Sequence, residues 1–360
     1  MKCAHCGHDS RRPERSEGRC PKCRQHFVFD PGDGDPLSDR SWLAAITQVS
    51  SEGSVRFTVA NLHEAVARRI APRRLGLGCG TFLFGAPFVV LPIALYVALG
   101  EALPLFLMLP VGVGLTFFAV RARLAGVRRP LSRSDFNALL RRWEKEHGRI
   151  SGLIRPTSKP RALSPELADE LAHYSFDRVV VCDRPETVDL LLGNDFHFEN
   201  NCAILTMGGY PEHAAPMVAR MLRTNPRLEV FVLHDATPEG CRLAHELRHD
   251  PAWFPDPGVR IFDVAIRPAQ ARRMSRLAWA LPTRASVRPH PGLTDAERRW
   301  LGRFELHLAA LSPEQIIKRL YRAMQQLPEL ASKAGGDSDG GVFIWTTDAS
   351  ASDGGGDSFG

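Results

Sequence analysis

Two uncharged runs in the first third of the chain constrain its fold most strongly. Residues 75–100 carry no charged side chain, and after Glu101 none occurs until Arg121. At about 1.5 Å per residue in a helix, each run is about long enough to cross a ~30 Å hydrocarbon layer. Residues 75–120 therefore predict a two-helix transmembrane hairpin, and a buried hairpin in a soluble core is the alternative.

Arginines flank this hairpin on both sides and set its predicted orientation. They are Arg68, Arg69, Arg73 and Arg74 before the first run, and Arg121, Arg123, Arg128 and Arg129 after the second. By the positive-inside rule both ends face the cytoplasm. We therefore predict a multi-pass protein of the cell inner membrane with both termini cytoplasmic and the lipid bilayer as a partner.

The charge of the chain adds little beyond this. The formal net charge is +6, and only six of the 46 basic residues are lysine. Such an excess suits phosphate or nucleic-acid binding. It also follows from codon bias and the arginines beside a membrane segment, and no other basic run stands out.

Two Cys-x-x-Cys pairs near the N-terminus give the most specific local pattern. Cys3, Cys6, Cys20 and Cys23 have the spacing C-x2-C-x13-C-x2-C, which brings four thiolates together in a tetrahedral site suited to Zn²⁺. Residues 1–30 resemble the small zinc ribbons at the start of many bacterial proteins. A site of four sulfurs is closed, so a structural rather than a catalytic zinc ion is expected. The other cysteines are expected to be buried apolar residues.

The remaining chain divides into segments of different composition. Residues 31–74 predict a small cytoplasmic α+β segment, with Asn61 capping its second helix. Residues 121–162 predict a polar helix and a linker. Residues 331–360 form a Gly/Ser/Asp tail with five acids, which predicts disorder.

Residues 163–330 predict an α/β domain. Strand-like runs alternate with helix-like segments, which indicates a mainly parallel sheet covered by helices. The runs are RVVVC, CAILTM, EVFVL and GVRIFDVAI. Two further helices are expected over residues 294–311 and 312–327. The predicted fold class is thus multidomain: a zinc ribbon, a transmembrane hairpin and a Rossmann-like α/β domain.

The strand ends of this domain carry a recognisable order of turns. Asp183 ends the first strand, LTMGGYPEH the second and LHDATPEG the third. This order, over about residues 176–265, resembles a Toprim domain, the metal-dependent module of topoisomerases and primases. It is similar in detail to the A subunit of type IIB topoisomerases. The matching residues are Gly209, Tyr210 and Pro211, then Asp235, Ala236, Pro238 and Gly240.

The departures from this family concern its acids. The resemblance implies a glutamate at the end of the first strand and an Asp-x-Asp pair that holds Mg²⁺. Here the first place holds Asp183, with Glu186 three residues on, and the second acid of the pair is Thr237. We therefore predict Asp183, Glu186 and Asp235 as a catalytic set that lacks one acid. The alternative for Asp235 is a structural cap of the following helix.

Several smaller features are candidates for binding. Gly208 and Gly209, with Thr237, are candidate ligand-binding residues, because glycine amides at a helix start can bind anions. His234 beside Asp235 is a further metal-ligand candidate. His245 and His249 lie one helical turn apart, which permits metal binding if a third ligand is present.

The sequence predicts a membrane-anchored binding or regulatory module with a catalytically degenerate Toprim-like domain. Its ligand would be a phosphate-bearing molecule, nucleic acid or a partner protein. One alternative is a Mg²⁺-dependent nuclease or phosphotransfer enzyme. A second is a structural membrane scaffold that recruits protein partners through the ribbon and the acidic tail.

Overall fold

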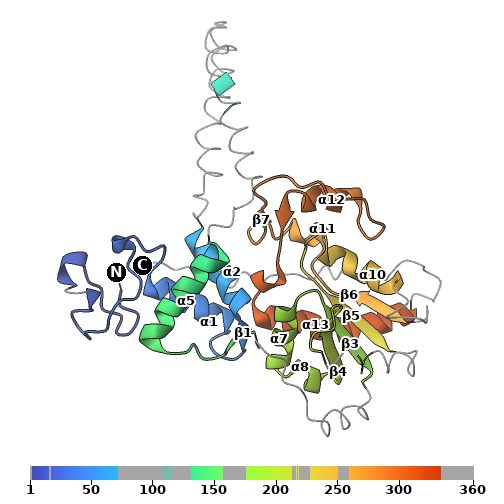
Figure 1. The fold of residues 1–360 in the computed structure, drawn as a ribbon, viewed down its shortest axis with the longest axis horizontal. Coiled ribbons are helices and arrows are strands. Elements are labelled where there is room, and N and C mark those ends of the chain that lie inside the picture. The colour runs from blue at the N-terminus through green and yellow to red at the C-terminus, as the bar shows by residue number, and fades with distance from the viewer. Residues whose placement is uncertain are drawn as a thin grey trace, which may run out of the picture.

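The computed structural model describes the chain in segments, and the other residues are drawn in Figure 1 as a grey trace. The described residues are 2–15, 18–71, 110, 111, 114, 131–156, 176–212, 216, 218, 228–249 and 259–333. A small cysteine ribbon, a helical unit and an α/β unit follow one another across the view in Figure 1. The predicted linker after residue 156 and the acidic tail from residue 334 lie outside the described residues.

Three helices form the helical unit, and they come from both sides of the stretch 72–130. They are α1 (Asp39–Val49), α2 (Val59–Ile70) and α5 (Arg133–His147). Their apolar faces enclose an aromatic cluster in which the Trp42 ring lies 5.9 Å from the rings of both Phe136 and Trp143. Aromatic side chains bury large areas, so this cluster contributes much of the apolar core of the unit.

Two short parallel strands, β1 (Phe57–Thr58) and β2 (Leu153–Ile154), close the helical unit. The strand ends at Thr58 because this residue caps α2: its hydroxyl accepts the Asn61 N–H at 3.3 Å. The Asn61 side chain in turn accepts the Thr58 N–H at 3.1 Å. Asn61 therefore completes a capping box and is not the cap residue that we predicted.

A four-stranded parallel sheet forms the centre of the α/β unit, with the strand order β4-β3-β5-β6. The strands are β3 (Arg178–Cys182), β4 (Cys202–Thr206), β5 (Glu229–Leu233) and β6 (Arg260–Asp263). This arrangement confirms the predicted parallel sheet. The carboxyl ends of β3 and β5 lie side by side, since Cys182 is in register with Leu233.

Both faces of the sheet are buried. Val180 and Phe231 contribute to one apolar cluster, whereas Val179 and Val230 contribute to another on the opposite face. Covering both faces with other elements explains why the strands read as continuous apolar runs in the sequence. The buried strands also include Cys182 and Cys202, as expected.

The helices and short strands around the sheet are less regular than predicted. They are α7 (Pro185–Gly193), α8 (Phe196–Glu199), η4 (Gly240–Arg242), α10 (Leu243–His249), α11 (Pro268–Ala271), β7 (Trp279–Ala280), α12 (Asp295–Leu301), β8 (Phe304–Glu305), η5 (Leu308–Ala310) and α13 (Pro313–Lys333). The predicted helix 294–311 is wrong as a single element. It breaks after Leu301, because β8 pairs with β7 in an antiparallel ladder. Near the N-terminus, η1 (Arg12–Glu14) and η3 (Pro31–Asp33) are single turns.

Polar contacts join the helical unit to the α/β unit. The Asn194 side chain accepts the Arg56 N–H at 2.8 Å and donates to the Arg56 carbonyl at 3.0 Å. In α2 itself, the Glu64 carboxylate accepts the Trp279 indole N–H at 2.7 Å. Glu64 is 2 % exposed, so this bond lies in the interior of the junction.

The helices of the structure contradict the predicted transmembrane hairpin. Among the described residues, no helix is both long and apolar enough to cross a membrane. The longest of them, α13, has 21 residues but carries charged side chains such as Lys318 and Arg319, whereas a span needs ~20 mainly apolar residues. This finding contradicts the predicted hairpin and the multi-pass inner-membrane location, and we withdraw both. Residues 75–120 themselves lie outside the described residues, except 110, 111 and 114.

Candidate functional site

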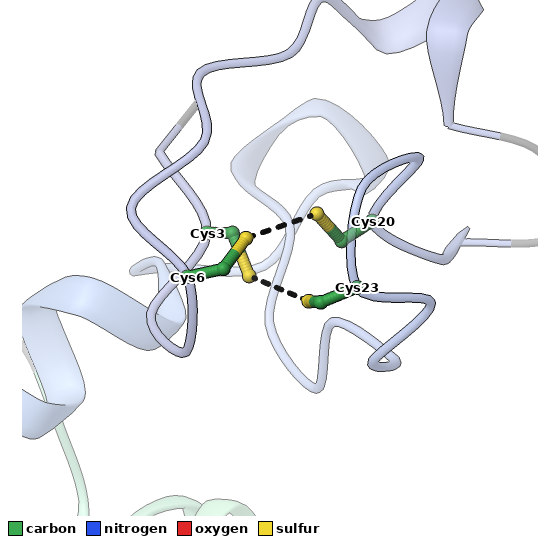
Figure 2. A group of neighbouring side chains, drawn as sticks. All are labelled: Cys3, Cys6, Cys20 and Cys23. Atoms are coloured by element: carbon green, nitrogen blue, oxygen red, sulfur yellow. Dashed lines mark hydrogen bonds between the residues drawn. The ribbon is translucent and has the colours of Figure 1, made fainter.

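The four N-terminal cysteines converge on one point from two similar turns (Figure 2). Their sulfur atoms all lie within 4.8 Å of one another, with Cys3 and Cys23 at 3.6 Å and Cys6 and Cys20 at 3.7 Å. A tetrahedron with Zn–S bonds of ~2.3 Å has edges of about 3.8 Å. The cluster can therefore hold a metal ion such as zinc, as the spacing predicted.

Each turn is shaped by its own backbone. The Cys3 N–H donates to the His8 carbonyl at 2.8 Å, and the Cys20 N–H donates to the Gln25 carbonyl at 2.9 Å. Gly7 and Arg24 adopt positive φ values of 69° and 55° at equivalent places, which lets each turn close tightly. The two halves of the ribbon thus present their thiols in the same way.

The backbone of the second turn also changes the acidity of its thiols. Hydrogen bonds from the backbone of Cys23 and Lys22 lower the pKa of Cys20 to about 6. For Cys23, the backbone of Gln25 acts in the same direction, but burial and the three neighbouring sulfurs outweigh it and raise the pKa to about 12. One thiol therefore ionises readily, and the crowding of sulfurs disfavours a second negative charge unless a cation is present.

The two predicted aspartates lie together at the carboxyl ends of β3 and β5. The Asp235 N–H donates to Oδ2 of Asp183 at 2.8 Å. Gly240 packs against this turn so closely that an added Cβ would lie 2.4 Å from the Asp235 carbonyl oxygen and 3.0 Å from Oδ2 of Asp183. A side chain at residue 240 would therefore displace the backbone that carries both acids.

The Asp235 carboxylate is engaged on both oxygens. Oδ1 accepts the Leu308 N–H at 2.7 Å, and Oδ2 forms an ion pair with the Arg184 guanidinium. Asp235 is 1 % exposed. Its neighbour Ala236 also bonds to the backbone of Leu306, so the whole turn is tied to the segment after β8. The acid therefore holds distant chain segments together, which differs from the helix cap that we considered as the alternative.

The Asp183 carboxyl differs from that of Asp235 in its hydrogen bonding. Its Oδ1 atom is buried and makes no hydrogen bond to the described residues. Burial and the nearby charge of Asp235 raise the pKa of Asp183 to about 6, although the Asp235 N–H works in the opposite direction. A buried carboxylate oxygen without a partner is uncommon and is often found at functional sites.

The other predicted site residues do not complete a metal site. The Thr237 hydroxyl accepts the Gly240 N–H at 3.1 Å, so the residue in the place of the second acid caps the local turn. Glu186 lies in the first turn of α7. Within the described parts of the chain, only the four cysteines place three or more ligand atoms within 4.8 Å of one another.

The glycine pair after β4 forms a closed turn. Gly209 has a φ of 83°, and its N–H donates to the Thr206 carbonyl at 2.9 Å. The Tyr210 N–H donates to the Thr206 hydroxyl at 3.0 Å. The amides of Gly209 and Tyr210 are thus used within the turn, and Gly208 and Gly209 do not line the cavity beside the acids.

His234 is also committed to the protein. The residue is fully buried, with Nδ1 2.7 Å from the Asp235 carbonyl oxygen and Nε2 3.2 Å from the Asp263 carboxylate. Burial alone would lower the pKa of His234, but Asp263 raises it well above its ordinary value. Asp263 also faces Arg267, which pairs with Glu297 at 3.1 Å. His234 and Arg267 are therefore the two positive members of a buried ionic chain.

A cavity of about 320 Å³ lies between the helical unit and the α/β unit, next to Asp235. Three helices begin at its wall, and their first turns contribute Thr58, Asn61, Ser132, Arg133, Arg184 and Glu186. His63, Glu64, His307 and Leu308 complete its polar edge. Sequence reasoning identified Glu186 but missed most of the others, because they come from distant segments.

No known family model matches the chain, and no curated protein or solved structure is significantly similar to it. The Toprim resemblance therefore rests on the residues and on the parallel sheet. The role that this resemblance implies for the chain is accordingly a proposal.

Proposed function

We propose that this protein is a binding or regulatory module without catalytic activity of its own. In this proposal its α/β unit is a Toprim-like domain whose acids have become structural, and the N-terminal ribbon carries a structural zinc ion. The ligand is a phosphate-bearing molecule held in the cavity between the two units. The parallel sheet, the order of turns at its strand ends and the cysteine cluster support this proposal.

The partners of the Asp235 carboxylate support the proposal that the protein has no catalytic activity of its own. A magnesium ion at this place would compete with the Arg184 guanidinium and with the Leu308 N–H for the same two oxygens. Mg²⁺ usually needs one or two carboxylates in addition to substrate phosphates. Thr237, in the place of the second acid, contributes no charge and already caps its own turn.

The charges at the cavity wall support the proposal that a phosphate-bearing ligand binds there. The starts of α2, α5 and α7 each present a partial positive charge to its wall, which favours an anion. Arg133 adds a full positive charge, whereas the charge of Arg184 is matched by Asp235. Two of the three acids there are compensated, since Glu64 accepts bonds from Arg68 and Trp279, and Asp235 pairs with Arg184. A phosphate group suits this balance better than a metal ion.

Titration calorimetry of the full chain with inorganic phosphate and with adenosine monophosphate tests the proposal. Arg133→Gln should weaken binding on the order of tenfold, since hydrogen bonds to charged groups are the strong ones. Glu186→Gln should tighten it, because it removes a negative charge from the same wall. Arg276→Gln is the matched control: Arg276 is exposed and does not line the cavity. Failure of both ligands to bind would contradict the proposal.

A Mg²⁺-dependent nuclease or phosphotransfer enzyme is the second candidate, and the unpartnered Oδ1 of Asp183 favours it. In that case Asp183, Glu186 and Asp235 would act on a bound phosphodiester. The full chain should then cleave DNA or RNA only with Mg²⁺, and Asp183→Ala and Glu186→Gln should abolish cleavage. Because Glu186→Gln should improve binding in the first proposal and destroy activity in the second, this one variant separates them.

A further inference from the structure

Three histidines gather on the surface of the α/β unit, away from the cavity. The rings of His245 and His249, one turn apart on α10, stack with centroids 4.1 Å apart. The ring of His290 meets His245 edge-on at 5.0 Å. His290 precedes α12 in the chain and reaches α10 because residue 292 is glycine. An added Cβ there would lie 2.9 Å from the Cβ of His245 and 3.2 Å from Nδ1 of His290.

We propose that His245, His249 and His290 bind one divalent transition-metal ion, such as Zn²⁺, Ni²⁺ or Cu²⁺. Imidazole nitrogen is a preferred ligand for these ions. Three protein ligands with water in the fourth position form a common open zinc site. Two histidines one helical turn apart face the same side of a helix. The ring of His290, from a distant segment, supplies the third ligand that the helix alone lacks.

A hydrogen bond already prepares the ring of His249, whereas the ring of His290 has to exchange one hydrogen bond for the metal. The Nδ1 atom of His249 lies 2.8 Å from the His245 carbonyl oxygen, to which it donates, so the lone pair is on Nε2. Metal-binding histidines usually donate their other ring N–H in this way. In His290, Nδ1 accepts the Gly292 N–H at 3.1 Å, so this nitrogen carries a lone pair. The metal would replace the Gly292 N–H at that atom.

The three rings have to rotate before they share one ion. Their ligand atoms do not all fall within 4.8 Å of one another, a criterion that only the cysteine cluster meets among the described residues. His249 is exposed at the end of α10, and His245 and His290 are partly exposed. Rotation of surface side chains is fast and needs no backbone change. Arg242 pairs with Glu246 at 3.7 Å, so this glutamate brings little uncompensated charge to the site.

The test uses the full chain with its ribbon first saturated with zinc, and Ni²⁺ as the probe in titration calorimetry. We expect one Ni²⁺ ion per chain. His290→Gln and His249→Gln should each weaken binding by about tenfold or more. His197→Gln is the control, because His197 lies on α8 and belongs to a different part of the surface. In the wild-type chain, Ni²⁺ should protect all three histidines from diethyl pyrocarbonate, as mapped by mass spectrometry.

Two results would overturn the inference. The first is Ni²⁺ binding that is unchanged in the double variant His245→Gln/His249→Gln. The second is full reactivity of His290 at Ni²⁺ concentrations that protect the other two, which would reduce the site to a helical pair. The protection experiment needs no variant, so a folding defect in a variant does not affect it. Neither result bears on phosphate binding in the cavity.

Discussion

Asp235 is held by two segments that are far apart in the sequence, the turn 183–184 between β3 and α7 and the segment around Leu308. Its N–H contacts Asp183 after β3, its Oδ1 accepts a bond from Leu308 before α13, and its Oδ2 pairs with Arg184 before α7. A buried acid with such partners stabilises the turn only while all of them remain. The residue that marks a metal site in the Toprim family therefore acts here as a structural junction.

Asp235→Asn should destabilise the protein moderately. The amide oxygen can still accept the Leu308 N–H, but the ion pair with the half-exposed Arg184 is lost. We expect the free energy of unfolding to fall by about 1–2 kcal/mol, as measured by urea denaturation. Asp295→Asn is the matched control, since its ion pair with Arg298 is exposed and should cost nothing measurable. Equal losses in the two variants would argue against the junction role.

Asp183 should make stability depend on pH in an unusual direction. Its pKa is raised to about 6 from 3.8, so the folded state binds its proton more tightly than the unfolded state. The Asp183 carboxyl therefore contributes to the free energy of unfolding at low pH, and this contribution is lost as the pH rises from about 4 to about 6. Urea unfolding at several pH values should show the free energy of unfolding of Asp183→Asn rising relative to that of the wild type, by about 2 kcal/mol over this range. A difference that stays constant with pH would contradict the raised pKa.

Among the elements, the sheet was the part that the sequence predicted well. Val179–Cys182 and Val230–Leu233 are apolar at every position because both faces of the strands are covered. The cysteine ribbon was equally predictable, since its spacing fixes which atoms meet. In both cases the sequence signal is local: a continuous apolar run marks each strand, and a fixed cysteine spacing marks each turn.

Elements that depend on distant partners were not predictable. Residues 294–311 read as one helix, yet Phe304–Glu305 leaves it to pair with Trp279–Ala280. The bond from Leu308 to Asp235 joins residues 73 positions apart. The cavity wall is likewise assembled from the starts of three helices. No local pattern in a single sequence records such pairings, so most of the candidate site became visible only in the fold.

The ribbon should depend on its metal, whereas the sheet should not. Metal analysis of the full chain is expected to find about one zinc ion, and Cys20→Ser should lose it because a closed site needs all four sulfurs. Hydrogen exchange in Cys20→Ser should then rise over residues 2–28 and stay unchanged in β3 and β5. Cys202→Ser, in the buried strand β4, is the control that should keep its zinc. Zinc retained by Cys20→Ser would contradict the four-cysteine site.

At the scale of the whole molecule, Glu64 links the two units. It lies on α2, accepts the Trp279 N–H at 2.7 Å and pairs with Arg68 at 2.9 Å. The ring of His307 lies 3.6 Å from its other oxygen. These contacts are at the edge of the cavity, so the distance between the units and the shape of the binding space depend on the same carboxylate.

Trp279→Phe should weaken this junction. The substitution keeps an aromatic ring but removes the N–H, which leaves one oxygen of a buried carboxylate short of a donor; we expect a loss of about 1–3 kcal/mol in unfolding free energy. Trp300→Phe is the control, because the Trp300 indole N–H makes no hydrogen bond to the described residues. A double-mutant cycle with Glu64→Gln should show strong coupling for Trp279 and none for Trp300. Additive effects for Trp279 would mean that the bond contributes little.

The helical unit closes around residues from both sides of the stretch 72–130. Ala71, at the end of α2, and Leu131, just before α5, both belong to its apolar core. The chain therefore leaves the core of the helical unit at Ala71 and returns to the same core at Leu131, after 59 intervening positions. Replacing these positions with a short glycine-serine bridge should leave that core intact, since the entropy of closing a loop changes slowly with its length. Evolution can therefore exchange residues 72–130 without changing the core of the helical unit.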